Sequence, residues 1–158
     1  MKLGLRIMLI LAMFLAGCSN KSDDPVVGVK AEDAEMNNAM AEAKSTVAGF
    51  VERMKNPQPK DYGFSVKKKI EDGDKVEFFW LSDITYADGK FTGTLGNNPQ
   101  IVSNVEFGQK MSVGETEIAD WMYLDGDKMV GNYTLRVLLK RMSKEEADTL
   151  RKQFQIDD

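Results

Sequence analysis

The stretch YGFSVKKKIEDGDKVEFFWL, residues 62–81, decides the fold. Between residues 64 and 70, apolar and polar side chains alternate, which is the period of a half-buried strand. Residues 71–74 contain the Asp-Gly pair that is typical of a tight hairpin turn. Residues 75–81 are apolar on both faces, so we expect this strand to be covered on both sides. The stretch therefore predicts an antiparallel β-hairpin.

Downstream of this hairpin, short apolar runs separated by turn residues predict further strands. We expect them at residues 84–86, 91–95, 111–113, 121–124, 128–130 and 133–139. One helical turn is expected at residues 115–120. Gly93 falls inside a strand, where a glycine indicates a bulge, a bend or a close approach of another backbone segment.

Helices are predicted on both sides of the strands. From Asp33 to Asn56, apolar residues recur every three or four positions, and Pro57 ends the pattern. Ser143 and Glu146 have the spacing of a capping box, which starts a short C-terminal helix. We therefore predict an α+β fold. It has an N-terminal amphipathic helix, a curved antiparallel sheet built from six or seven of these short strands, and a short C-terminal helix.

The N-terminus has the layout of a secretory signal. Two basic residues precede an apolar run at residues 7–16, which is about half as long as a bilayer-crossing helix. Residues 15–18, Leu-Ala-Gly-Cys, resemble the lipobox of bacterial lipoproteins. This resemblance implies that residues 1–17 are a signal peptide. It also implies that Cys18 becomes the first residue and carries a diacylglyceryl thioether and an amide-linked chain such as palmitate.

These features predict a membrane protein held by lipid. Residues 18–30 comprise the lipid-bearing cysteine and a polar segment, which we interpret as a flexible tether. Residues 31–158 are predicted to form a single α+β domain. Ser19 follows the lipid-bearing cysteine, whereas an Asp at this position resembles an inner-membrane retention signal. We therefore expect an anchor in the outer membrane, with the domain facing the periplasm.

Composition excludes several kinds of chemistry. Loss of the two basic residues of the signal would change the formal net charge from −4 to −6, which argues against a nucleic-acid partner. With no histidine and one cysteine, the chain has no Ser-His-Asp or Cys-His machinery, Cys/His zinc site or internal disulfide. Methionines of the first helix share its apolar stripe with Val and Phe, which favours core packing over copper binding. We predict no metal and no cofactor.

Four blocks within residues 62–142 resemble a bacterial family of unknown function, typified by YegJ-like lipoproteins. The blocks are VEFFWLSDI at 76–84, FTGTL at 91–95, IADWMY at 118–123 and GNYTLR at 131–136. The resemblance implies a compact α+β module. It implies no activity, and it suits binding better than catalysis.

Carboxylates near two tryptophans are the best candidate site. Glu77, Asp83 and Asp120 lie close in sequence to Trp80 or Trp121. Two such carboxylates could serve as acid and base on a glycan, or bind a hard cation. Structural roles as strand and turn residues are the commoner outcome, and we favour them. For both tryptophans core packing is the default, and exposure would instead indicate a binding surface.

The predicted strand at residues 133–139 contains two further candidates for binding. It places Tyr133 and Arg136 on opposite faces. Arg136 could pair with Asp83 or Asp120 inside the fold, or clamp a ligand.

The sequence thus favours a lipid-anchored binding or structural module for an envelope protein or cell-wall polymer. Two alternatives stay open, a carboxylate-dependent hydrolase acting on an envelope glycan and an immunity-type protein that binds a toxin.

Overall fold

The computed structural model describes residues 33–156. The elements in chain order are α2 (Ala34–Lys55), β1 (Asp61–Asp72), β2 (Lys75–Ala87), β3 (Lys90–Leu95), β4 (Lys110–Gly114), β5 (Ile118–Asp125), β6 (Lys128–Gly131), α3 (Tyr133–Leu139) and α4 (Lys144–Phe154). The predicted signal peptide, Cys18 and the tether lie outside the described residues. None of the helices described combines the length and apolarity needed to cross a bilayer.

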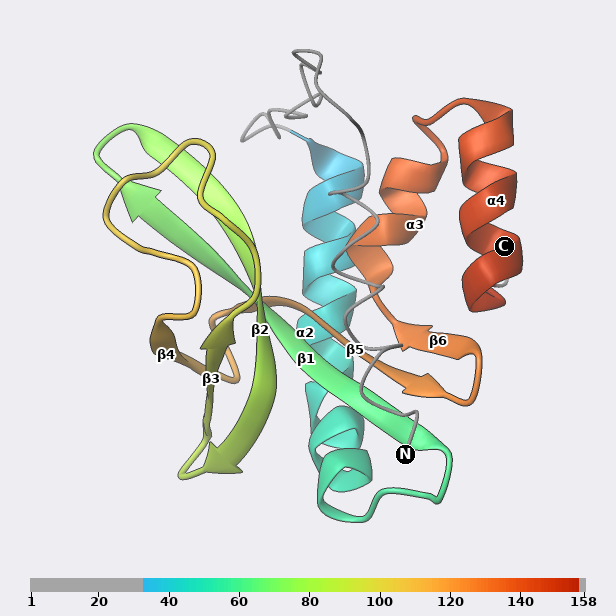
Figure 1. The fold of residues 1–158 in the computed structure, drawn as a ribbon, viewed down its shortest axis with the longest axis horizontal. Helices are drawn as coiled ribbons and strands as arrows, with labels where there is room; N and C mark the ends of the chain where they lie inside the picture. Colours follow the sequence, from blue (N-terminus) through green and yellow to red (C-terminus); the bar gives the residue numbers. More distant parts are fainter. Residues whose placement is uncertain (1–32, 157–158) are drawn as a thin grey trace. The chain divides into compact units, whose positions relative to one another are not determined.

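The strands form one open antiparallel sheet in the order β4-β3-β2-β1-β5-β6 (Figure 1). The predicted hairpin is its centre, with Val66 of β1 opposite Leu81 of β2. Helices precede and follow the strands in the chain, so the predicted α+β class is confirmed. The capping box is also present, because the side chains of Ser143 and Glu146 each bind the backbone N–H of the other.

The sheet curls strongly. The Lys68 Nζ on β1 donates a hydrogen bond of 2.6 Å to the carbonyl oxygen of Ser112 on β4, three strand spacings away. In a flat sheet these strands would be about 14 Å apart, beyond the reach of a lysine side chain. Register shifts in β1 and β2 supply local bends.

The apolar stripe of α2 packs on the sheet, as predicted. Its Phe50 is 1% exposed and stacks on Trp121 of β5 with ring centroids 4.9 Å apart. The Trp121 Nε1 donates to the carbonyl oxygen of Ala43, at 2.9 Å. An aromatic stack and a satisfied indole N–H at one point orient the helix across the sheet.

Three local predictions are corrected. Residues 75–87 form one strand, with a register shift near Asp83, where φ is +50°. Residues 115–120 contain no helix, because β5 already begins at Ile118. Only one face of β2 is fully covered: Phe79 and Leu81 are buried, whereas Val76 is 38% exposed. At Gly93 the close approach is real, since a Cβ there would lie 2.7 Å from the Ser82 oxygen.

The predicted last strand is wrong, because residues 133–139 form the helix α3. Gly131 and Asn132 both have positive φ, of 78° and 52°, which turns the chain away from the sheet. Tyr133 and Arg136 therefore share one side of a helix, and the guanidinium carbon lies 5.7 Å from the Tyr133 ring centroid. The Arg136 Nη1 donates to the Gly131 carbonyl oxygen, and Arg136 pairs with neither Asp83 nor Asp120.

Candidate functional site

Asp120 is the most enclosed of the three candidate carboxylates. Its side chain is 0% exposed and accepts four hydrogen bonds. Backbone N–H groups of Trp121, Tyr133 and Thr134 donate at 2.9, 3.1 and 2.8 Å, and the Thr134 hydroxyl donates at 2.6 Å. Two of these N–H groups are the free donors at the start of α3, so Asp120 caps a helix that begins 13 residues later.

Lys67 completes this cluster from β1. In the sheet, Lys67 is the cross-strand partner of Asp120 on β5 and of Trp80 on β2. The Nζ donates to the Thr134 Oγ1 at 2.5 Å and lies 4.5 Å from the Trp80 ring centroid. The Thr134 hydroxyl thus accepts a hydrogen bond from the ammonium group and donates one to the Asp120 carboxylate. Enclosure of the ammonium group lowers the pKa of Lys67 to about 8, and the nearby Asp120 opposes this shift.

The lowered pKa of Lys67 predicts a pH-dependent stability. Between pH 8 and about 10.5 the folded protein has released a proton that the unfolded chain still binds, so the free energy of unfolding rises with pH in this window. Between pH 7.5 and 10, the free energy of unfolding of the wild type is expected to rise by roughly 2–3 kcal/mol more than that of K67M. Urea unfolding of both proteins at several pH values measures the difference. The exposed Lys69 of the same strand supplies the control, because K69M is expected to follow the wild-type curve. A wild-type to K67M difference that stays constant with pH would contradict the assignment.

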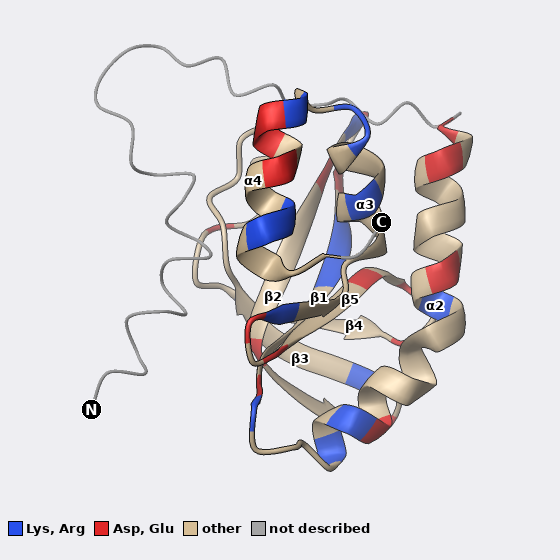
Figure 2. Ribbon diagram, turned by 90° about the vertical axis from the view of Figure 1, so that its right-hand side faces the viewer, with Lys and Arg blue, Asp and Glu red and all other residues tan. Residues whose placement is uncertain are grey.

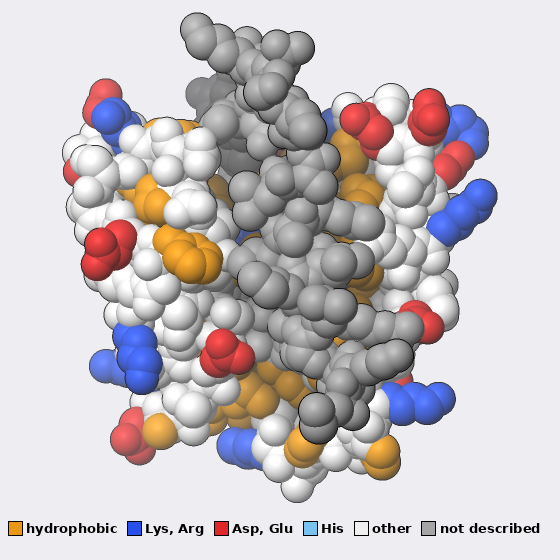
Figure 3. Space-filling model, viewed as in Figure 1, with side chains coloured by type: hydrophobic (Ala, Val, Ile, Leu, Met, Phe, Trp, Pro, Cys, Tyr) orange, Lys and Arg blue, Asp and Glu red, His pale blue; other side chains and the backbone are white. Residues whose placement is uncertain are grey.

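Glu77 has a structural role in the loop between β3 and β4. Its carboxylate accepts from the backbone N–H groups of Gln100, Ile101 and Val102 at 2.9–3.1 Å. Asp72 binds the next residue, Ser103, in the same way. These bonds hold the loop against the β1–β2 hairpin, where Figure 3 shows hydrophobic side chains at the surface.

The remaining predicted site residues lie in different parts of the fold. Asp83 is exposed at the register shift of β2, where its positive φ is tolerated better by Asp and Asn than by most residues. Trp121 belongs to the core, with 5% exposed, whereas Trp80 is partly buried under the Lys67 ammonium group. Among the described residues, no group of three or more acidic side chains could hold a metal ion.

Tyr133 and Arg136 line a groove between α2, α3 and α4. Its volume is about 430 Å³. Its lining comprises Glu35, Asn38, Ala39 and Glu42 of α2, Tyr133, Arg136, Val137 and Leu139 of α3, Lys140, and Arg151 of α4. Figure 2 shows both acidic and basic positions on α2 and on α4, and a basic position on α3. Glu77, Asp83 and Asp120 do not line this groove, so it does not contain the carboxylates that the sequence suggested for the hydrolase alternative.

The charges of this groove are not evenly matched. The Glu35 carboxylate lies 3.9 Å from the Lys140 Nζ and 3.4 Å from the Arg141 Nη2. Arg136 is partly buried, and among the described residues it has no carboxylate within ion-pair distance. The Arg136 guanidinium also contacts the Tyr133 ring, and a guanidinium is the group best suited to bind carboxylates and phosphates through paired N–H donors.

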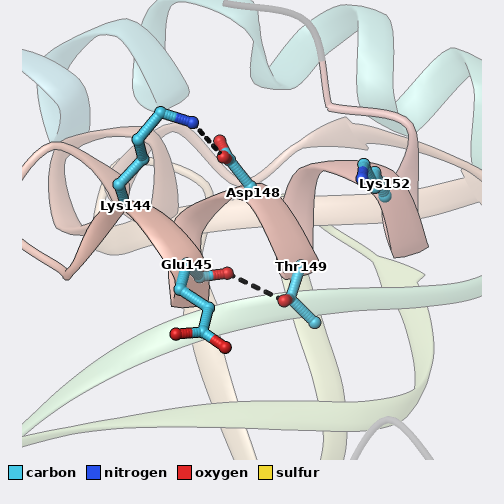
Figure 4. Close-up of a pocket in the computed structure, with 5 residues that line it drawn as sticks. All are labelled: Lys144, Glu145, Asp148, Thr149 and Lys152. Carbon is cyan, nitrogen blue, oxygen red and sulfur yellow. Dashed lines mark hydrogen bonds and ion pairs between the residues drawn. The ribbon is translucent and has the colours of Figure 1, made fainter.

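A second depression lies on the outer face of α4. Figure 4 shows its residues, with an ion pair between Lys144 and Asp148 and a bond from the Thr149 hydroxyl to the Glu145 carbonyl oxygen. All five lining residues belong to one helix, which offers no opposing wall. The groove with Arg136 is therefore the better candidate for a binding site.

Comparison with known proteins assigns the chain to a family. The family model described as "Uncharacterized protein conserved in bacteria (DUF2314)" matches residues 33–157. The chain belongs to this family. It is 42% identical over 149 residues to the uncharacterized protein YegJ of Escherichia coli strain K12, covering 92% of this chain and 95% of YegJ. No solved structure matches.

A second relative of this DUF2314 chain is larger. Over 77 residues, 48% of the chain, it is 36% identical to a protein of Neisseria meningitidis serogroup B named as a putative ankyrin repeat protein. The match spans 30% of that protein's length. A segment similar to part of this chain therefore occurs within a longer protein.

Sequence reasoning missed Lys67, Thr134 and the α2 side of the groove. Lys67 lies in a run of three lysines, which reads as a solvated strand, and only its cross-strand neighbours distinguish it. Glu35, Asn38 and Glu42 follow helical spacing on α2, but nothing in the sequence tells that α3 faces them.

Proposed function

We propose that the chain is a lipid-anchored lipoprotein of the bacterial envelope, whose domain binds a partner through the groove between α2, α3 and α4. The observation that carries the binding role is Arg136, a partly buried guanidinium in a groove with no carboxylate partner among the described residues. A partner that presents a carboxylate or another oxygen anion fits this site, because the Arg136 guanidinium has N–H donors and no carboxylate partner among the described residues.

The location of the protein follows from its N-terminus in this proposal. Cleavage before Cys18 and two or three acyl chains on that residue would anchor the protein far more firmly than a single chain does. The tether, residues 19–30, would let the domain stand up to about 40 Å from the lipid surface. With Ser19 after the cysteine, the outer membrane is the proposed site, with the domain in the periplasm.

The anchor has a direct test. Mass spectrometry of the native protein is expected to find an N-terminal Cys18 that carries a diacylglyceryl group and an additional acyl chain. The C18S variant is expected to retain its leader and lose the lipid mass. A native protein that keeps residues 1–17, or that carries a free thiol in the soluble fraction, would remove the proposed location and leave the groove proposal standing.

The groove is tested by site-specific photocrosslinking in cells. A photoreactive amino acid in place of Asn38 lies in the groove. The same amino acid in place of Thr149 lies on the outer face of α4. We expect a crosslinked partner from position 38 and none from position 149. Adding R136Q should lower the yield at position 38 at least about 10-fold, since a charge-assisted hydrogen bond is lost.

Matched variants separate binding from folding. K152Q removes an exposed charge from α4 and is expected to leave the yield unchanged. R136K keeps the charge but not the planar fork, so an intermediate yield is expected. Equal crosslinking from positions 38 and 149, or a yield at position 38 that R136Q leaves unchanged, would exclude the groove as the binding site.

A further inference from the structure

Two methionine sulfurs and one asparagine amide meet where β6 leads into α3. The Asn132 Nδ2 lies 3.3 Å from the Met129 Sδ and 3.7 Å from the Met122 Sδ. Met122 on β5 and Met129 on β6 share one face of the sheet, because Met129 pairs with Leu124, two residues beyond Met122. Side chains from three segments therefore converge on one point.

The Asn132 amide is poorly satisfied there. The residue is 7% exposed, and its Oδ1 is the one buried side-chain nitrogen or oxygen among residues 33–156 without a hydrogen-bond partner. A buried acceptor left unpaired is destabilising, because it has lost its hydrogen bonds to water. At the other end of the amide, the NH₂ group has only thioether sulfurs as acceptors within residues 33–156, and these are weak acceptors. A half-turn about the Cβ–Cγ bond, which exchanges oxygen and nitrogen, would break only these weak hydrogen bonds to sulfur.

We propose that Met122, Met129 and Asn132 form a binding site for a soft monovalent cation of the Cu(I) type. After the half-turn, Oδ1 takes the place of Nδ2, at 3.3 and 3.7 Å from the two sulfurs. Donors that lie roughly 2.0–2.3 Å from a shared trigonal ion are on the order of 3.5–4 Å apart. The two distances from the amide to the sulfurs thus already lie near the spacing of a three-coordinate site.

The donor set selects the class of metal. Thioether ligands suit Cu(I) and not the hard cations that prefer carboxylate oxygen. All three ligands are neutral, so a monovalent ion leaves less uncompensated charge in the buried site than a divalent one. Met129 is 4% exposed, whereas Met122 is only partly buried and offers the path of entry.

Silver(I) is a suitable probe, because it is soft, monovalent and stable in air. The experiment uses the full-length chain with C18S, which removes the competing thiol, and ¹³C-methyl labelling of its 10 methionines. We expect one equivalent of Ag(I) to shift the Met122 and Met129 methyl signals together before the others. M122L, M129L and N132G should each weaken Ag(I) binding at least about 10-fold, and Cu(I) should displace the bound silver.

The variants are chosen to keep the fold. Leucine replaces methionine with little change in volume, and glycine suits the positive φ of Asn132. M54L on α2, a partly buried methionine remote in sequence, is the control and should bind silver as the parent does. Unmoved Met122 and Met129 signals at one equivalent, or M122L and M129L variants that bind Ag(I) as tightly as the parent, would overturn the site.

Discussion

Replacing Asp120 by alanine is expected to lower the free energy of unfolding by about 3–5 kcal/mol, or to prevent folding. The substitution removes four hydrogen bonds at a fully buried carboxylate. It leaves the first N–H groups of α3 without an acceptor and the Lys67 ammonium group without its nearby negative charge. Urea unfolding followed by far-ultraviolet circular dichroism measures the loss.

Asp83 provides the matched control, because it belongs to the same set of candidate carboxylates but is exposed. D83N is expected to change stability by less than about 0.5 kcal/mol, since asparagine also tolerates positive φ. If D120A does not fold, D120N still reports the role of Asp120. Its NH₂ group cannot accept from the α3 amides, so faster hydrogen exchange at Tyr133 and Thr134 is expected. A loss below about 1 kcal/mol for D120A would contradict the capping role.

Gly131→Ala is expected to destabilise the protein by roughly 3–4 kcal/mol. Gly131 has φ of +78°, and a Cβ there would lie 2.3 Å from the Trp121 carbonyl oxygen and 2.6 Å from two atoms of its ring. The ring cannot move aside freely, because it stacks on Phe50 and its Nε1 is bonded to the Ala43 carbonyl oxygen. Thermal and urea unfolding of the variant measure the effect.

Gly126 separates backbone strain from crowding. It also has positive φ, of 62°, but its nearest contact for an added Cβ is the flexible Lys60 side chain at 3.8 Å. G126A should therefore cost only the backbone strain of about 1–2 kcal/mol. If G126A and G131A lower the free energy of unfolding equally, the close approach of Trp121 to residue 131 does not contribute to the effect.

Periodicity predicted most of the fold because the elements involved bury one face locally. The α2 stripe, the 62–81 hairpin and the Ser143 capping box all follow from residues within one or two turns of each other. The split of β2 into two predicted strands came from Asp83, which reads as a turn. Pairing with β3 holds both halves in one strand across that irregularity.

The error at α3 shows where local signals fail. Residues 133–139 are rich in aromatic, β-branched and aliphatic side chains, which favour a strand. The segment is a helix because Gly131 and Asn132 turn it off the sheet and Asp120 satisfies its first N–H groups. That cap comes from a different strand, so no window of sequence around Tyr133 contains it. The same error hid the groove, since it placed Tyr133 and Arg136 on opposite faces.

By itself, the sequence determined the α+β class, the strand order of the central hairpin and the chemistry excluded by the lack of histidine, because composition and alternation act over a few neighbouring residues. Its N-terminal pattern also supplies the proposed anchor. Only the tertiary structure decided which polar groups are enclosed together: Asp120 with Lys67 and Thr134, Arg136 with α2, and Asn132 with two methionines. The reason is physical, since the protonation and binding properties of such groups depend on the burial and charge of residues that folding brings close from distant parts of the chain.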